Sequence, residues 1–203
     1  MKNFWDQRYL EADYAYGEFP NEYLKEKLSS LSPGKVLFPA EGEGRNAVFA
    51  ANLGWEVSAF DLSEQAKIKA EKLAEEKLVR IDYRVETIET SMYHENSLDA
   101  VVLVFAHFPA EKRKACHSKI ATWLKSGGTL IIEGFSKNHI QNQKENPAVG
   151  GPKDPSMLYD LEELKQDFPD FRFAEALETE TILSEGKYHQ GKSSVIRIFA
   201  VKN

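Results

Sequence analysis

The stretch Val36-Leu-Phe-Pro-Ala-Glu-Gly-Glu-Gly-Arg-Asn46 opens the segment that decides the fold, and Gly54-Trp-Glu-Val-Ser-Ala-Phe-Asp61 closes it. We interpret this segment as a strand, a glycine turn, a helix from about 45 to 53 and a second strand. Glycines at 42 and 44 let the backbone turn tightly and approach a ligand with no Cβ in the way. The first N–H groups of the helix point at that ligand. Asp61 ends the second strand, where a carboxylate accepts both hydroxyls of a ribose. The pattern predicts a pocket for a nucleoside cofactor.

The glycine turn also fits the fingerprint of dinucleotide-binding proteins, because Gly42, Gly44 and Ala47 have the required spacing. Glu41 and Glu43 separate the two possibilities. A pyrophosphate beside these carboxylates would meet a repulsion of roughly 1–4 kcal/mol per close charge pair. S-adenosylmethionine has no phosphate, and it carries a sulfonium and an ammonium group. The turn therefore favours S-adenosylmethionine over NAD.

Composition limits the class of protein. The chain has 203 residues and a net charge of −6, with no run of basic residues, so the usual electrostatic footprint of a nucleic-acid-binding protein is missing. No apolar segment approaches the ~20 residues that cross a bilayer, and the N-terminus has no apolar signal region. Cys116 is the single cysteine, which excludes an internal disulfide. We expect one cytoplasmic domain over 1–203, a small-molecule partner, no nucleic acid and no membrane, as a monomer or small homo-oligomer.

Strand and helix patterns alternate from 36 to 135, which predicts a parallel sheet with right-handed crossovers. Pro109 is expected to begin a helix that Gly127 and Gly128 end. The C-terminal part breaks the alternation. Phe171–Ile182 and Ser193–Val201 read as strands separated by about ten residues rich in turn formers, too few for a crossover helix. These two strands are predicted to form an antiparallel pair at one edge.

Two polar segments are candidate lids. Residues 1–31 are expected to form an N-terminal helical lid, with a short helix near 3–10. Residues 136–159 are expected to form a lid loop, because unstructured connections of this length in compact domains are usually functional or disordered. This loop follows a strand, and ligands of open α/β sheets bind at the carboxyl ends of the strands.

Together these segments resemble a small class I S-adenosylmethionine-dependent methyltransferase. Within that class the chain is similar to the group of bacterial tellurite-resistance and thiopurine methyltransferases. The motifs that carry the resemblance are Trp5-Asp-Gln-Arg-Tyr9, Tyr16-Gly-Glu-Phe-Pro-Asn21, Glu41-Gly-Glu-Gly-Arg-Asn46, Glu133-Gly-Phe135, Gly150-Gly-Pro-Lys-Asp-Pro155 and Glu185-Gly-Lys-Tyr-His-Gln-Gly191. The resemblance implies a three-layer, Rossmann-like α/β methyltransferase fold, with a mostly parallel seven-stranded sheet and an antiparallel C-terminal strand pair.

The resemblance also implies a set of cofactor contacts. Phe38 and Ala40 depart from the family pattern, which usually has an acid and a glycine at these positions. The third strand usually ends in an aspartate beside the adenine, and either Glu86 or Thr87 takes that place here. Arg8 is expected to hold the methionine carboxylate by a two-pronged hydrogen bond. The expected cofactor-binding residues are Ala40, Glu41, Gly42, Gly44, Asp61, Leu62, Glu86, Thr87, Phe105, Arg8 and Tyr16.

His107 is the candidate catalytic residue. It directly follows an apolar strand, so we expect it beside the methyl donor, where it could act as a general base. His189 is a weaker candidate. His94, His117 and His139 are interpreted as surface residues, and the spacing of the five histidines predicts no metal site.

The expected reaction is methyl transfer from S-adenosylmethionine to a small soft nucleophile, such as a thiol or a chalcogen oxyanion. Two alternatives are a nicotinamide-dependent oxidoreductase and a non-catalytic relative that binds S-adenosylmethionine. Glu41, Glu43 and the terminal antiparallel pair oppose the first alternative, and the departures at Phe38 and Ala40 encourage the second. The sequence identifies neither the acceptor nor the oligomeric state.

Overall fold

The structure is a computed structural model that describes residues 2–203. The helices are α1 (Lys2–Tyr9), α2 (Glu22–Ser29), α3 (Arg45–Asn52), α4 (Glu64–Glu76), α5 (Ala110–Trp123), α6 (His139–Glu145) and α7 (Leu161–Asp167), with two short 3₁₀ helices, η1 (Pro147–Val149) and η2 (Pro155–Met157). The strands are β1 (Lys35–Pro39), β2 (Glu56–Asp61), β3 (Asp82–Val85), β4 (Leu98–Val104), β5 (Leu124–Phe135), β6 (Phe171–Glu185) and β7 (His189–Lys202).

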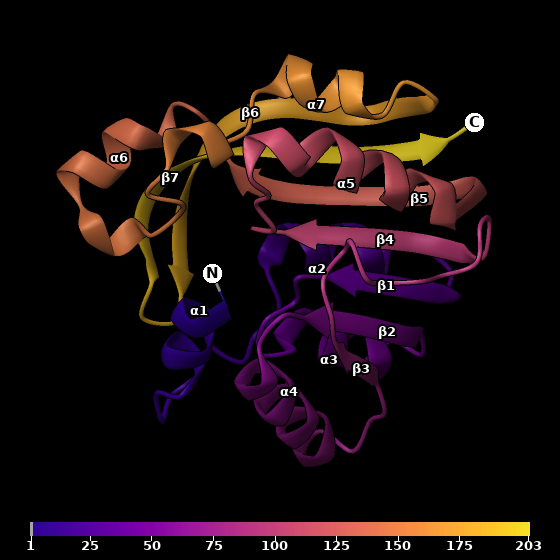
Figure 1. Ribbon diagram of the computed structural model, residues 1–203, viewed down its shortest axis with the longest axis horizontal. Helices are drawn as coiled ribbons and strands as arrows, with labels where there is room; N and C mark the ends of the chain where they lie inside the picture. Colours follow the sequence, from indigo (N-terminus) through magenta and orange to yellow (C-terminus); the bar gives the residue numbers. More distant parts are fainter. Residues whose placement is uncertain (1) are drawn as a thin grey trace.

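The seven strands form one sheet in the order β3-β2-β1-β4-β5-β7-β6. Strands β1 to β5 pair in parallel, whereas β7 lies antiparallel between β5 and β6 (Figure 1). The carboxyl ends of the parallel strands therefore meet at one edge of the sheet. The predicted α/β architecture, with its mostly parallel sheet and antiparallel C-terminal pair, is confirmed.

Helices cover both faces of the sheet. Leu24 and Leu28 of α2 and Ala47 of α3 pack with Phe38 and Val102 in one core cluster. The opposite cluster joins residues of α5 and α7, among them Ile120, Trp123 and Leu164, to the other face of the same strands. In Figure 1, α5 lies in front of the sheet and α2 and α3 lie behind it. This is a three-layer arrangement in which each central strand is covered on both sides.

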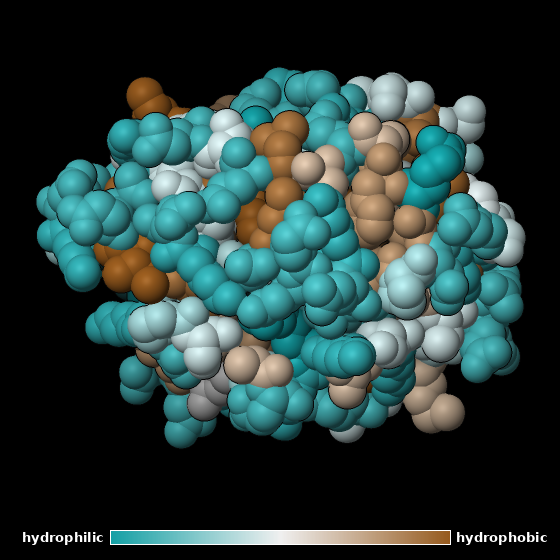
Figure 2. Space-filling model, turned by 90° about the horizontal axis from the view of Figure 1, so that it is seen from above, coloured by the Kyte–Doolittle hydropathy of each residue, from teal (hydrophilic) through white to brown (hydrophobic). Residues whose placement is uncertain are grey.

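The exterior is mostly polar. Figure 2 shows the molecule from above, the side on which α7 and β6 lie in Figure 1; hydrophilic residues cover most of this surface and hydrophobic side chains emerge in separate areas. Within residues 2–203, no helix is long and apolar enough to pass through a membrane.

Two details, one at each end of β5, differ from the sequence prediction. Helix α5 ends at Trp123 and β5 begins at the next residue, so Gly127 and Gly128 lie within the strand and do not end the helix. The segment 136–159 is not an open loop, since it contains α6, η1 and η2. Parallel pairing of Ser136 with Tyr159 closes the base of this segment. Because Val149, Leu158 and Tyr159 are buried, the segment is anchored by apolar packing.

The C-terminal strands are longer than predicted. Strands β6 and β7 pair from Phe171↔Lys202 to Glu185↔His189, so the turn contains only residues 186–188. The expected connection of about ten residues was wrong, because its polar residues belong to the strand ends. The extended hairpin reaches past the sheet to α1 (Figure 1), where the backbone N–H of Lys187 donates to the carbonyl of Ala15.

Candidate functional site

The ribose position predicted at Asp61 lies at the carboxyl end of β2, next to the glycine turn. The backbone N–H groups of Gly42 and Ser63 donate to the two carboxylate oxygens of Asp61, at 3.2 and 3.0 Å. The carboxylate is buried, and burial raises its pKa to about 6 despite these bonds. Asp61 thus fixes the turn to the neighbouring strand and keeps a carboxylate beside it.

Glu41 has a local structural role that was not predicted from the sequence. Its Oε1 accepts the backbone N–H groups of Asn46 and Ala47, both at 2.8 Å, in the first turn of α3. The helix begins at Gly44, which has no side chain to cap it, so Glu41 supplies the missing acceptor. Burial raises the pKa of Glu41 to about 7. The N-terminus of α3 is therefore satisfied from within the chain.

The glycines of the turn have different neighbours. A Cβ on Gly44 would lie 2.6 Å from the Cβ of Ala70, and its φ is +88°, so Gly44 allows α4 to pack against the turn. A Cβ on Gly42, whose φ is +67°, would lie 2.8 Å from the Tyr9 hydroxyl. Ala40 adopts a φ of +52°, a conformation that favours the glycine expected there. Gly42 faces α1, and the close approach to a ligand predicted there stays a prediction. The structure gives Gly44 a packing role.

The end of β3 presents an acid without a partner. The backbone N–H of Glu86 donates to the carbonyl of Asp61 at 3.0 Å, which brings the two acids to adjacent strand ends. The Oε1 of Glu86 is buried and accepts no hydrogen bond from residues 2–203. Thr87 instead contacts Thr90, with 3.4 Å between their hydroxyl oxygens. Of the two residues that the sequence left open, Glu86 has the free acceptor that an adenine amino group needs, and Leu62 lies half-buried beside Asp61.

The N-terminal lid places Arg8 and Tyr16 against the hairpin turn. Arg8 donates to the Tyr16 hydroxyl at 3.3 Å, and its guanidinium lies 3.6 Å from the centre of the Tyr188 ring. Glu11 forms an ion pair with Lys187 at 2.8 Å. The lid and the hairpin are therefore joined by charged and aromatic contacts, and the carboxylate partner predicted for Arg8 stays a prediction.

His107 lies where it was predicted, after β4, but both of its ring nitrogens are engaged. Nδ1 lies 2.9 Å from the Met157 carbonyl, and Nε2 accepts the Phe135 backbone N–H at 3.1 Å. Burial lowers the pKa of His107 to about 3. Its catalytic role stays a prediction, and the geometry favours a structural role. Phe105, with a φ of +51°, stacks on Phe135.

Glu43 and Arg45, which flank the start of α3, pair with other residues and not with each other. Both are buried. Glu43 pairs with Lys69 and accepts the backbone N–H of Ala15, each at 2.7 Å. Arg45 instead pairs with Glu185 of the hairpin at 2.8 Å. The two residues thus connect α3 to two different segments that lie far from it in the sequence.

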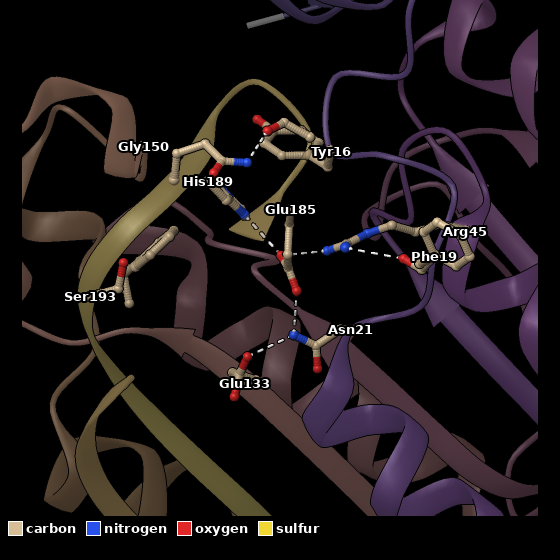
Figure 3. A network of polar contacts seen from close by, with 12 residues as sticks. Tyr16, Phe19, Asn21, Arg45, Glu133, Gly150, Glu185, His189 and Ser193 are labelled. Atoms are coloured by element: carbon tan, nitrogen blue, oxygen red, sulfur yellow. Dashed lines mark hydrogen bonds and ion pairs between the residues drawn. The ribbon is translucent and has the colours of Figure 1, made fainter. Parts of the chain in front are cut away.

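Glu185 is the centre of a buried polar network that includes His189 (Figure 3). Besides Arg45, it contacts Nδ1 of His189 at 3.2 Å and accepts the Asn21 amide at 3.0 Å. The same amide donates to Glu133 at 2.7 Å, and Glu133 pairs with Arg197 at 2.5 Å. The network contains two carboxylates and two guanidinium groups, each paired. From the sequence, His189 is a weaker candidate than His107, and the structure places it in this network.

A cavity of about 310 Å³ opens beside this network, between residues 16–23 and strand β6. Tyr16, Asn21, Arg45, Glu133, Glu185 and Arg197 are among the residues that line it. The cavity is polar on its network side and has no unpaired cation among these residues. It is large enough for a small molecule.

The remaining titratable residues limit the chemistry. His117 and His139 are fully buried, so their prediction as surface residues was wrong. Cys116 is buried as expected. In the part of the chain that the structure describes, no group of three or more His, Cys, Asp or Glu side chains is arranged to hold a metal ion.

Comparisons with known proteins agree with this geometry. Residues 36–128 match the family model described as a methyltransferase domain. A comparison of the sequence with curated proteins finds no significant match.

Similar solved structures extend the agreement to the whole chain. One, described as the conversion of a disulfide bond into a thioacetal group during echinomycin biosynthesis, has a TM-score of 0.78 at 17% identity, covering 100% of this chain and 92% of that one. TehB from Haemophilus influenzae has a TM-score of 0.73 at 20% identity, covering 100% and 67%. The magnesium protoporphyrin IX methyltransferase ChlM from Synechocystis PCC 6803, solved with bound SAH, has a TM-score of 0.68 at 18% identity, covering 90% and 83%. The chain thus has the Rossmann-like fold of the class I methyltransferases, and residues 36–128 match the methyltransferase domain.

Proposed function

We propose that the protein is an S-adenosylmethionine-dependent methyltransferase that acts on a small soft nucleophile. The observation that carries the proposal is the position of Glu41. Its carboxylate accepts the N–H groups of Asn46 and Ala47, which are the donors that bind pyrophosphate in dinucleotide-binding proteins. A dinucleotide would have to displace a buried carboxylate and then lie beside it. S-adenosylmethionine has no phosphate and needs none of these donors.

The order of the strands gives the direction in which the cofactor would lie. Glu86, Asp61 and Gly42 follow β3, β2 and β1, which are successive neighbours in the sheet. The free acceptor of Glu86 suits the adenine amino group, Asp61 suits the ribose hydroxyls and Gly42 suits the amino acid portion. The methyl end then reaches the next strand, β4, at the point where Phe105 follows it. When bound, the cofactor supplies a methyl group that is activated by a sulfonium.

The N-terminal lid would cover the bound cofactor. The Tyr9 hydroxyl lies over Gly42, so α1 must shift to admit the cofactor and can then close on it. Arg8 contributes a cation on the same helix for the methionine carboxylate. The protein's tasks are to bind the cofactor, orient the acceptor and exclude water.

The comparisons support the class of cofactor. TehB and ChlM share the fold, and the ChlM structure contains SAH, the product form of this cofactor. The acceptor is a small molecule, since the cavity of about 310 Å³ has that size and a net charge of −6 opposes nucleic acid. We propose a monomer or small homo-oligomer.

Calorimetry with S-adenosylhomocysteine and with NADH tests the proposal. We expect micromolar or tighter binding of S-adenosylhomocysteine and no measurable binding of NADH. The reverse preference would identify a nicotinamide-dependent oxidoreductase. Turnover of S-adenosylmethionine with a panel of thiols and chalcogen oxyanions then separates an enzyme from a protein that only binds the cofactor.

A further inference from the structure

We infer that His189 is the general base that removes the proton from the acceptor, and that Glu185 positions it. The inference rests on the proposed function and specifies its acceptor. The two residues pair at the end of the β6–β7 hairpin, in the register Glu185↔His189. Figure 3 shows the His189 ring directed at the Glu185 carboxylate.

The hydrogen bond between them determines which nitrogen is basic. Oε2 of Glu185 lies 3.2 Å from Nδ1 of His189. A carboxylate only accepts hydrogen bonds, so Nδ1 carries the proton and Nε2 keeps its lone pair. Within residues 2–203, the hydrogen bond to Glu185 is the one that the His189 ring forms, and it engages Nδ1 and leaves Nε2 without a partner. A carboxylate that holds a histidine in this way is the arrangement of a general base with its orienting partner.

Glu185 is held in its ionised form and is not itself the base. Arg45 donates to its Oε2 at 2.8 Å, and the Asn21 amide donates to its Oε1 at 3.0 Å. The Arg45 charge and these hydrogen bonds outweigh burial and hold the pKa of Glu185 at about 2. Glu185 is therefore a positioning residue that acts through His189.

The location of His189 fits contact with the methyl acceptor. Its ring centre lies 4.4 Å from that of Tyr16 and 4.5 Å from that of Phe105, the residue that follows β4. The proposed cofactor places its methyl group at that strand end. His189 does not itself line the cavity of about 310 Å³, but Tyr16 and Glu185, which contact it, both do. We place the acceptor in this cavity, with its thiol directed past Tyr16 and Glu185 toward the histidine.

The neighbouring histidines lack a free nitrogen. His107 uses both ring nitrogens, on Met157 and Phe135. His139 does the same, with Nε2 at 3.2 Å from the Gly150 carbonyl and Nδ1 accepting the Ser194 N–H at 3.3 Å. Of the three histidines packed around Phe135, His189 is the one with an unused ring nitrogen in the described chain.

The base acts on a neutral acceptor, whereas an acceptor that is already ionised does not need it. The proton of an acceptor thiol passes to Nε2 of His189, and a sulfur lone pair forms the new bond to the methyl carbon. The electron pair of the breaking C–S bond returns to the sulfonium sulfur, which becomes a neutral thioether. A chalcogen oxyanion has no proton to lose and would meet Glu185 and Glu133, whose cationic partners are already paired. The aromatic rings of Tyr16 and Phe105 favour a thiol with an apolar or aromatic body.

The charge state of His189 depends on several groups around it. Burial lowers the pKa of His189 below its ordinary value, and Glu185 opposes that shift. The titratable and charged groups that face it from neighbouring elements are Glu185, Arg45, Arg8, Tyr16, His107 and His139. At neutral pH the ring is uncharged, as a base must be.

Two variants with matched controls test the inference. In His189→Gln the base is absent, and in Glu185→Gln the carboxylate becomes an amide of the same size. His94→Gln replaces an exposed histidine, and Glu180→Gln replaces an exposed glutamate on the same strand as Glu185. Each is assayed with 2-mercaptoethanol, a mostly protonated thiol, and with 4-nitrothiophenol, which is ionised at neutral pH. We expect His189→Gln to lose about 10²–10⁴-fold in kcat/KM with the first acceptor and far less with the second. The two controls should match the wild type.

A readout independent of activity is the tautomer of His189, measured by ¹⁵N NMR of the histidine-labelled wild-type protein. We expect a protonated Nδ1 and an unprotonated Nε2 at neutral pH, and a shift of this balance in Glu185→Gln. Equal losses for both acceptors, an unchanged rate, or a protonated Nε2 would overturn the inference. Failure of the wild type to bind S-adenosylhomocysteine would instead overturn the proposed function, and the tautomer would still report on the pair.

Discussion

The cofactor region and the acceptor region of this molecule are built in different ways. In the cofactor region, residues 35–87, contacts join near neighbours in the sequence: Glu41 binds a backbone group five residues away, and Asp61 binds one that is 19 residues away. In the acceptor region, Asn21 joins Glu133 and Glu185 across separations of 112 and 164 residues. The first region is a strand–turn–helix unit, and the second is assembled from the N-terminal segment, the end of β5 and the β6–β7 hairpin.

The kind of bond differs as well. Backbone N–H groups hold the carboxylates of Glu41 and Asp61, so the turn geometry is fixed by the main chain. Side-chain charges hold Glu133 and Glu185. Loss of one member of such a buried network destabilises the protein, because the charges of the remaining members are left unpaired and no water takes the place of the lost partner. We therefore expect the cofactor region to respond to backbone changes and the acceptor region to respond to loss of single charges.

The largest expected effect is on stability, from a methyl group added to the glycine turn. Gly44→Ala places a Cβ 2.6 Å from that of Ala70 at a φ of +88°. Overpacking and backbone strain together should cost about 2–5 kcal/mol. Gly127→Ala is the matched control, since its φ is +80° and nothing lies within 4 Å of its added Cβ. It should cost only about 1 kcal/mol. Urea denaturation of both variants measures the difference, and equal costs would contradict the packing role of Gly44.

The second effect concerns cofactor affinity. Asp61→Asn keeps the size of the side chain and removes the charge that would accept the ribose hydroxyls. The loss should be about 1.5–3 kcal/mol, or roughly 10- to 100-fold in the dissociation constant of S-adenosylhomocysteine. Calorimetry measures it. Asp82→Asn, on the exposed start of β3, is the control and should bind like the wild type. An unchanged affinity in Asp61→Asn would remove this residue from the site.

The contrast between the regions explains what the sequence could predict. The strand, the glycine turn, the helix that follows it and the second strand depend on residues close together in the chain, and the prediction of these elements is confirmed. The sheet architecture is also confirmed, because long apolar strands and their spacing restrict the topology. The role of Glu41 as a helix cap was missed, although a glycine at the helix start beside an upstream acid is a local signal that could have shown it.

The acceptor region could not be predicted in the same way. The residues around Glu185 and His189 include glycine, lysine and glutamine, which are typical of loops, so they were assigned to a connection of about ten residues. Pairing with β7 and contact with the N-terminal segment keep them in strand conformation. Once the strands extend to a turn of residues 186–188, Glu185 and His189 become cross-strand neighbours. That register depends on tertiary contacts, which local propensity does not contain.

A third, smaller effect is the difference in stability between variants of two helix N-caps. Asn21 caps α2 by accepting the Leu24 N–H at 2.9 Å, and Ser63 caps α4 by accepting the Ala66 N–H at 3.2 Å. Ser63→Ala should cost about 1 kcal/mol, the usual loss of a cap. Asn21→Ala also removes donors from Glu133 and Glu185, so it should cost about 1–3 kcal/mol more. Thermal unfolding of both variants measures the difference. Equal costs would mean that the network adds no stability beyond the cap.

The smallest effect is a pH dependence that separates the cofactor region from the acceptor region. Burial raises the pKa of Asp61 from 3.8 to about 6. In the unliganded protein this makes the folded state bind the proton more tightly than the unfolded state, so the Asp61 contribution to stability falls as pH rises from about 4 to 6. Ligand binding should change in the opposite sense, because the ionised carboxylate is the form that accepts the ribose hydroxyls. Affinity for S-adenosylhomocysteine should therefore weaken by roughly fourfold between pH 7.5 and 5.5. The measurement contains no methyl acceptor, so proton transfer from an acceptor to His189 does not contribute to it. Calorimetry of the wild type and of Asp61→Asn at both pH values tests this, and the affinity of the variant should not change with pH. The same fourfold change in both proteins would assign the titration to another group. Glu41 would then be the first residue to test, because its pKa is about 7.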